Sequence, residues 1–202
     1  MNYRKAFIVT CLSSLIALIV TSILLKKNNK LTFELATKLP SPKSITELEL
    51  IDSTGKNMPS SELKGKWTVL TFGFTNCPDI CPAAMASFKS EISLLKKSAK
   101  ENVQFVFISV DPNRDSPKSL QNYADFFSKD IKTFTATEQN LKSLTKALGA
   151  HYEIEGDLSS PNYNVGHAPY YYIINPKFEW VAFYNPPILK GAISNEFNKV
   201  FN

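Results

Sequence analysis

The sequence lacks the residues and motifs on which several large enzyme classes depend. Only seven of its 202 residues are glycine, three are cysteine and two are histidine. It shows no glycine-rich loop for phosphate, no serine paired with a base and no pair of carboxylates placed for acid–base work. Nucleotide-binding enzymes and hydrolases of these types are therefore not indicated. Internal repeats and low-complexity tracts are also absent, which argues against repeat architectures.

The folded part also lacks an excess of positive charge, although the whole chain carries +5. Residues 1–45 hold seven of the 23 basic residues and one of the 18 acidic residues, which gives +6 there and −1 in the remainder. No basic stripe interleaved with aromatic residues follows. The sequence therefore predicts no nucleic-acid partner, and its positive charge belongs to the N-terminal flank.

The N-terminus has a long uncharged run, residues 6–25, which is long enough to cross a bilayer as a helix. We expect residues 1–30 to be a single-pass membrane anchor with basic flanks, followed by a proline-containing linker over residues 31–45. A cleaved signal peptide is the alternative, but no small-x-small site closes the run. The basic flanks, which leave the orientation open, are Arg4, Lys5, Lys26, Lys27 and Lys30.

Residues 46–202 alternate between apolar strands and amphipathic helices, which predicts one α/β domain with a mixed sheet flanked by helices. Residues 153–166 are polar and are expected to form a loop. Helix caps are predicted at Ser116 and Thr137. The expected strands are 46–52, 67–73, 103–110, 134–136, 170–174 and 180–184, and the expected helices are 83–97, 117–127, 137–148 and 192–201.

Two of the three cysteines, Cys77 and Cys81, lie where a buried strand ends and a helix begins with Pro82. The free N–H groups of a helix start lower thiol pKa values, so this position predicts thiolates. Residues four apart share a helix face, so the sulfurs can form a disulfide or hold one soft metal ion. A stapling disulfide or two buried thiols are the structural alternatives. Cys11 lies inside the apolar run, so a four-thiolate zinc site is excluded.

The two histidines differ in their surroundings. His167 follows Gly166 and precedes an apolar strand, whereas His151 is expected to end a helix or to lie on an exposed turn. A lone histidine is more often structural than a ligand, and the local sequence does not decide between these roles for His167.

Three separated motifs, FTNCPDICPAAM, ISVDPNRDSP and VGHAPYYYIINP, resemble those of the Sco/SenC family from about Leu48 to the C-terminus. These are membrane-tethered copper proteins with a thioredoxin-like fold. The resemblance implies that Cys77, Cys81 and His167 bind copper. Two thiolates and one imidazole suit Cu(I) and tolerate Cu(II), and zinc also fits the ligand types.

The resemblance also implies a function and a location. It implies a metallochaperone that delivers copper to the copper-bearing subunit of cytochrome c oxidase and can reduce that subunit's cysteines. An upstream copper donor or a thiol reductant would be a further partner. The domain would face the bacterial periplasm or the mitochondrial intermembrane space, anchored through residues 6–25.

A thiol–disulfide oxidoreductase that uses Cys77 and Cys81 without a metal is the main alternative, and a redox or copper sensor is a weaker one. One departure from the family favours exchange: Ala168 and Pro169 follow the histidine, where thioredoxins have a cis-proline beside their cysteines. Asp79, between the cysteines, is expected either to tune the site by its charge or contact a partner, or to be a carboxylate at the helix start. No catalytic role is assigned to Asp111, Arg114 and Asp115, which capping and ion pairing explain at least as well.

Overall fold

An apolar strand, β4 (Trp67–Gly73), lies at the centre of the fold, and its residues from Thr68 onward are all buried. It pairs in parallel with β5 (Val103–Ser109), which is buried along its whole length, and antiparallel with β9 (Tyr171–Ile174). The structure is a computed structural model that describes residues 33–158 and 163–201. Because β4 is buried on both faces, it can position a site at its carboxyl end rigidly.

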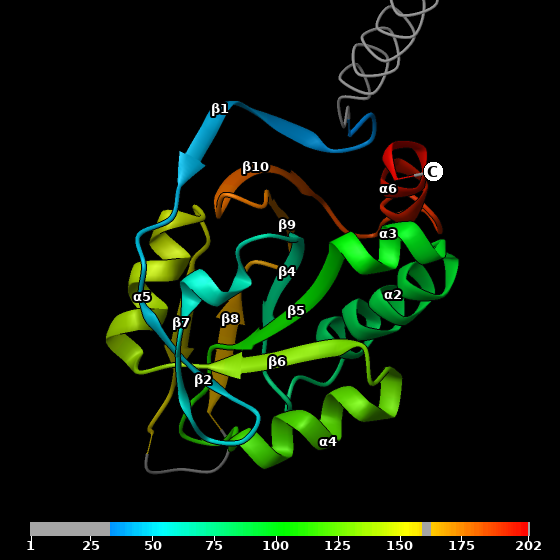
Figure 1. Ribbon diagram of the computed structural model, residues 1–202. Helices are drawn as coiled ribbons and strands as arrows, with labels where there is room; N and C mark the ends of the chain where they lie inside the picture. The colour runs from blue at the N-terminus through cyan, green and yellow to red at the C-terminus, as the bar shows by residue number, and fades with distance from the viewer. Residues whose placement is uncertain (1–32, 159–162, 202) are drawn as a thin grey trace, which may run out of the picture. The chain divides into compact units, whose positions relative to one another are not determined.

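The main sheet has eight strands in the order β1-β10-β9-β4-β5-β6-β2-β3 (Figure 1). The β4–β5–β6 part is parallel and the remaining pairs are antiparallel, so the sheet is mixed as predicted. The other strands are β1 (Thr37–Ser44), β2 (Glu49–Asp52), β3 (Asn57–Pro59), β6 (Ile131–Thr135) and β10 (Glu179–Tyr184).

Helices cover both faces of this sheet. On one face, Phe88 of α2 (Ile80–Leu94) packs against Phe105 of β5 and Tyr171 of β9. On the other, Leu141 of α5 (Glu138–Ala147) belongs to a core with Leu70 of β4. The remaining helical segments are η1 (Ser60–Leu63), α3 (Lys97–Asn102), α4 (Pro117–Phe127) and α6 (Ser194–Val200).

Both predicted helix caps are confirmed. Ser116 Oγ accepts a hydrogen bond from the Ser119 N–H at 3.1 Å at the start of α4. Thr137 Oγ1 accepts one from the Asn140 N–H at 3.3 Å at the start of α5. Each cap satisfies a backbone donor that the first helical turn leaves without a partner.

Part of the predicted linker is a strand. Residues 37–44, inside the 31–45 stretch, form β1, which pairs antiparallel with β10. Phe33 is also buried, and its ring lies 5.5 Å from that of Trp67 and 5.7 Å from that of Phe197. The prolines did not prevent pairing because β1 is an edge strand, where a missing N–H can face solvent.

The loop predicted for residues 153–166 is also wrong in part. Tyr152–Glu155 form β7 and Asn164–His167 form β8, and these two strands make a separate antiparallel ribbon. The spacing of Leu120, Tyr123, Phe126 and Phe127 predicts an apolar face on α4, but Phe126 is 80% exposed. The predicted membrane span over residues 6–25 lies outside the described residues. Within the described part of the chain, no helix is long and apolar enough to span a bilayer.

Candidate metal-binding site

The two cysteines lie in the connection between β4 and α2. The Cys77 N–H donates to the Phe74 carbonyl at 3.3 Å, which folds the connection into a turn. Cys81 is the second residue of α2, so Pro82 is its third residue and not its first. Cys77 is 8% exposed and Cys81 is 1% exposed, and both are free thiols.

Gly73, the last residue of β4, creates the space that the Cys81 sulfur occupies. A Cβ atom on this glycine would lie 2.8 Å from Cys81 Sγ and 2.6 Å from the Phe107 ring. Real Cβ atoms do not approach other atoms so closely, so a larger residue would displace one of the two. We did not identify Gly73 from the sequence, although a glycine ending an apolar strand is a signal of close approach.

His167 brings the third donor to the same place from the β7–β8 ribbon, where it pairs with Tyr152. Its Nε2 lies 3.4 Å from Cys81 Sγ, although 86 positions separate the two residues. Its Nδ1 lies 3.3 Å from the Val165 carbonyl oxygen. A proton on Nδ1 satisfies that carbonyl and leaves the Nε2 lone pair facing the sulfur. The Phe74 ring packs edge-on against the imidazole, with 5.6 Å between ring centroids.

Burial favours the neutral forms of Cys81 and His167. It raises the pKa of the Cys81 thiol far above its ordinary value, and the Cys77 thiol and the Asp115 charge act in the same direction. Burial also lowers the pKa of His167. The predicted thiolate is therefore wrong for Cys81, because desolvation outweighs the favourable field of the helix start.

The three predicted ligands do not all contact one another directly. Cys81 and His167 meet directly, and Cys77 is near enough to affect the Cys81 thiol. Among the described residues, no trio of histidine, cysteine, aspartate or glutamate side chains is already arranged to hold a metal ion. The preformed part of the candidate site is thus the pair formed by Cys81 and His167.

The β5–α4 loop, residues 111–115, is hydrogen-bonded to the connection that carries the cysteines. Asp115 is fully buried and accepts hydrogen bonds from the Thr75 N–H at 2.9 Å, from the Thr75 hydroxyl and from the Ser109 hydroxyl at 2.6 Å. Thr75 precedes Cys77 by two residues, so these bonds fix the start of the cysteine loop. Asp115 therefore has a structural role.

Three other residues that the sequence analysis considered take no part in the site. Asp79 is exposed and its side chain caps no helical N–H. His151 is exposed, as predicted, and its Nε2 lies 3.7 Å from a Glu153 carboxylate oxygen. The Ala168–Pro169 bond is trans, since the cis bond among the described residues joins Pro186 and Pro187. The arrangement that thioredoxins use beside their cysteines is not present at Pro169.

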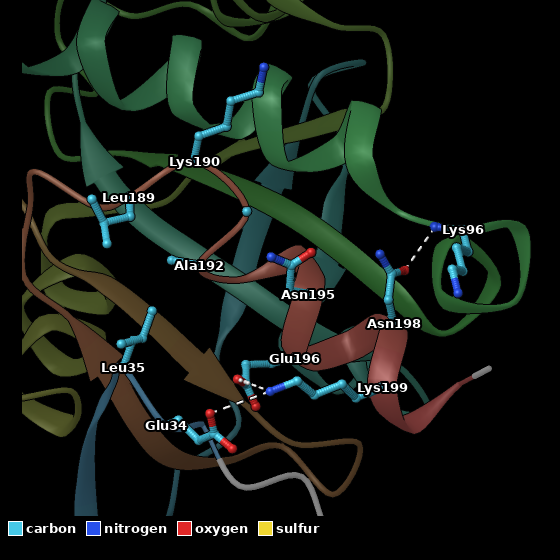
Figure 2. A pocket seen from close by; sticks show the side chains of 11 residues that line it. Glu34, Leu35, Lys96, Leu189, Lys190, Ala192, Asn195, Glu196, Asn198 and Lys199 are labelled. Carbon is cyan, nitrogen blue, oxygen red and sulfur yellow. Dashed lines mark hydrogen bonds and ion pairs between the residues drawn. The ribbon is translucent and has the colours of Figure 1, made fainter.

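A pocket beside α6 is lined by residues such as Glu34, Asn195 and Lys199 (Figure 2). It is formed by the residues after Phe33, the loop before α6 and α6 itself. Lys199 crosses it and pairs with Glu34 at 3.4 Å and with Glu196 at 3.2 Å. None of Cys77, Cys81 and His167 lines it.

A mixed sheet with two cysteines at a strand–helix junction and a histidine brought against them defines a thioredoxin-like domain with a thiol-based site. The comparisons with known proteins identify the family. Residues 37–202 match the family model described as SCO1/SenC, and the chain belongs to this family.

Two curated relatives show how far the similarity extends. A "putative copper-binding protein" of Stutzerimonas stutzeri is 34% identical over 142 residues, covering 68% of this chain and 67% of that protein. "Protein SCO1 homolog 1, mitochondrial" of Arabidopsis thaliana is 34% identical over 135 residues, covering 67% of this chain and 40% of that protein. The similarity therefore spans less than half of the plant protein.

The solved structures confirm the predicted thioredoxin-like α/β fold. The structure of Arabidopsis thaliana ScoI with copper bound is 31% identical, with a TM-score of 0.67, and the match covers 77% of this chain and 96% of that one. Copper is the metal that these names connect with the family.

Proposed function

We propose that this chain is a copper metallochaperone in which Cys77, Cys81 and His167 hold the ion. Two sulfurs and one imidazole nitrogen form a soft donor set that suits Cu(I). The names of the relatives support copper over zinc, which the ligand types alone would also accept.

The 3.4 Å separation between Cys81 Sγ and His167 Nε2 is the observation that supports the proposal most strongly. Two donor atoms at this separation would be able to bind one ion between them. Cys77 completes the set by turning toward them.

Loading exchanges protons for the metal. The Cys81 thiol must release its proton before the sulfur can bind, whereas burial lowers the pKa of His167 and so favours the neutral imidazole that a metal requires. We infer that an acceptor's thiolate or imidazole displaces the ligands one at a time, beginning at Cys77, which is 8% exposed whereas Cys81 is 1% exposed. Cargo can thus pass to a partner without being released to water.

The acceptor and the location follow from the family resemblance. We propose the copper-bearing subunit of cytochrome c oxidase as the acceptor, with an upstream copper donor or a thiol reductant as the other partner. We also propose that residues 1–30 anchor the chain and that the domain faces the periplasm or the mitochondrial intermembrane space. The Arabidopsis relative carries "mitochondrial" in its name, which supports the second location.

A titration of the reduced full-length chain in detergent with Cu(I), against a competing chelator, tests the ligand set. We expect Cys77→Ser, Cys81→Ser and His167→Ala each to lower the affinity. His151→Ala is the matched control, because the side chain of this histidine is exposed and its Nε2 lies beside a Glu153 carboxylate oxygen. Equal copper affinity in His167→Ala and in the unaltered chain would rule out the histidine as a ligand.

Dithiol exchange remains the second candidate because Cys77 and Cys81 are free and interact with one another. In that reaction the two thiols become one disulfide, and two electrons and two protons pass to the partner's disulfide, which opens to two thiols. Disulfide reduction that survives His167→Ala, together with copper binding that is indifferent to His167, would favour this function.

A further inference from the structure

The β7–β8 ribbon, which carries His167, is not part of the main sheet. Among the described residues, β8 pairs only with β7, and neither strand joins the eight-stranded sheet. Backbone hydrogen bonds to the main sheet therefore do not set the position of the imidazole. Other contacts must hold it beside the cysteine loop.

Tyr163, the residue before β8, makes the polar part of this attachment. Its ring is 5% exposed, and its hydroxyl donates a hydrogen bond to Asp111, which is fully buried in the β5–α4 loop. Arg114 of the same loop donates from Nη1 to the Tyr163 carbonyl oxygen at 2.8 Å and from Nε to Asp111 at 2.5 Å. We call Asp111, Arg114 and Tyr163 the ribbon clamp.

The clamp also contacts the cysteine side of the site. The Arg114 guanidinium carbon lies 3.7 Å from the centre of the Tyr163 ring and 5.5 Å from that of Phe74. Phe74 packs against the His167 ring, and its carbonyl accepts the Cys77 N–H. One guanidinium thus contacts the two segments that carry the ligands, and the same loop holds Thr75 through Asp115.

We infer that the ribbon clamp positions His167 against Cys81 and thereby sets how tightly the site holds copper. This inference rests on the proposed function and extends it to residues that do not touch the ion. Tyr163 and Arg114 are positioning residues, since each acts through the imidazole. Loss of a group that orients a ligand typically lowers metal affinity by about 10- to 100-fold.

The test compares two tyrosine-to-phenylalanine variants of the reduced full-length chain. Tyr163→Phe removes the hydroxyl that bonds Asp111 and keeps the ring under Arg114. Tyr152→Phe is the matched control, because Tyr152 lies on the other strand of the ribbon and its buried hydroxyl has no hydrogen-bond partner among the described residues. We expect Tyr163→Phe to lower Cu(I) affinity by about tenfold or more and Tyr152→Phe to leave it unchanged.

Repeating Tyr163→Phe in the His167→Ala background separates positioning from general stability. A positioning role predicts no further loss of affinity there, because the imidazole that the clamp orients is gone. The thiolate-to-copper absorption of the Cu(II) form should also change in Tyr163→Phe and not in Tyr152→Phe. If Tyr163→Phe does not fold, Arg114→Lys replaces it under the same criteria, since lysine keeps the charge and loses the planar fork.

Two results would overturn the inference. One is an unchanged copper affinity in Tyr163→Phe. The other is that Tyr163→Phe lowers copper affinity by the same factor in the His167→Ala background as in the unaltered chain. The His167→Ala variant alone shows whether the proposed ligand set is wrong, so that failure can be told apart from these two results. If His167→Ala itself leaves copper affinity unchanged, the proposed ligand set is wrong and the inference falls with it. If His167→Ala weakens binding while Tyr163→Phe does not, only the clamp is refuted.

Discussion

Cys81 shows that the chemistry of a single residue depends on burial as much as on its place in the sequence. Its position at a helix start was visible in the sequence and predicted a thiolate. The structure places it at 1% exposure, where burial raises the pKa of the thiol. The extent of burial depends on Gly73 and Phe107, which pack around it from other parts of the fold. The residue type of the site was thus predictable, and its protonation state was not.

Gly73→Ala should damage the site directly. The added methyl would overlap Cys81 Sγ and the Phe107 ring, so the sulfur or the ring must shift. We expect a loss of about 1–3 kcal/mol in the free energy of unfolding, as is typical of overpacked cores. Copper affinity should fall as well, measured by chelator competition alongside urea unfolding.

Gly166→Ala is the control for this substitution on the histidine side of the site. A Cβ there would meet only ordinary contacts, the nearest at 3.9 Å from the Glu153 carbonyl oxygen. Its stability should stay within about 0.5 kcal/mol of the unaltered chain. If both alanine variants behaved alike, the close approach at Gly73 would have no functional consequence.

At the scale of elements, the alternating strands and helices of the core were predictable because the strands are apolar and because Ser116 and Thr137 cap α4 and α5. The β7–β8 ribbon was not predicted because each strand is four residues long. Tyr152–Glu155 does alternate apolar and polar residues, but the alternation includes only two apolar residues and lies in a polar stretch. β1 was missed because it is largely exposed, and its pairing depends on the free edge of β10. When few residues of a strand are buried, its formation depends on the neighbouring strand with which it pairs.

Glu91 is the contact that joins α2 to the segment leading into α6. Its carboxylate is 1% exposed and accepts hydrogen bonds from the N–H groups of Gly191 at 2.7 Å, Ile193 at 3.2 Å and Ser194 at 2.7 Å. Glu91→Gln replaces one acceptor oxygen with a donor that faces these N–H groups. We expect a loss of roughly 2 kcal/mol or more in the free energy of unfolding, measured in urea.

Glu101→Gln serves as the matched control, because Glu101 is exposed on α3. It should change stability by no more than about 0.5 kcal/mol. A Glu91→Gln chain as stable as this control would show that the three hydrogen bonds contribute nothing to holding α6.

At the scale of the whole molecule, buried tyrosines make the domain sensitive to alkali. Burial raises the pKa of Tyr123, Tyr172 and Tyr184 above the ordinary value. Above about pH 10 the unfolded chain releases these protons and the folded chain keeps them, so stability falls as pH rises. Each phenol that stays neutral contributes up to about 1.4 kcal/mol per pH unit to this loss.

Tyrosinate absorbance and circular dichroism, followed together in alkali, check this expectation. The buried phenols should ionise in the same step in which the helical signal is lost. Their ionisation in a chain that keeps its helical signal would contradict the burial described for them.

The convergence of the site is a whole-molecule property. Cys77 and Cys81 could be paired from their spacing, whereas His167 was joined to them only by family resemblance. No local pattern reports that a residue 86 positions away returns to the same strand end. The clamp residues were similarly visible as charged residues of a loop, and their contact with Tyr163 required the folded chain.

X-ray absorption spectroscopy of the copper-loaded, reduced full-length chain tests the central claim most directly. We predict two sulfur donors and one nitrogen donor, with the nitrogen lost in His167→Ala and kept in His151→Ala. A sulfur-only copper site whose spectrum is the same in the unaltered chain and in His167→Ala would contradict the account.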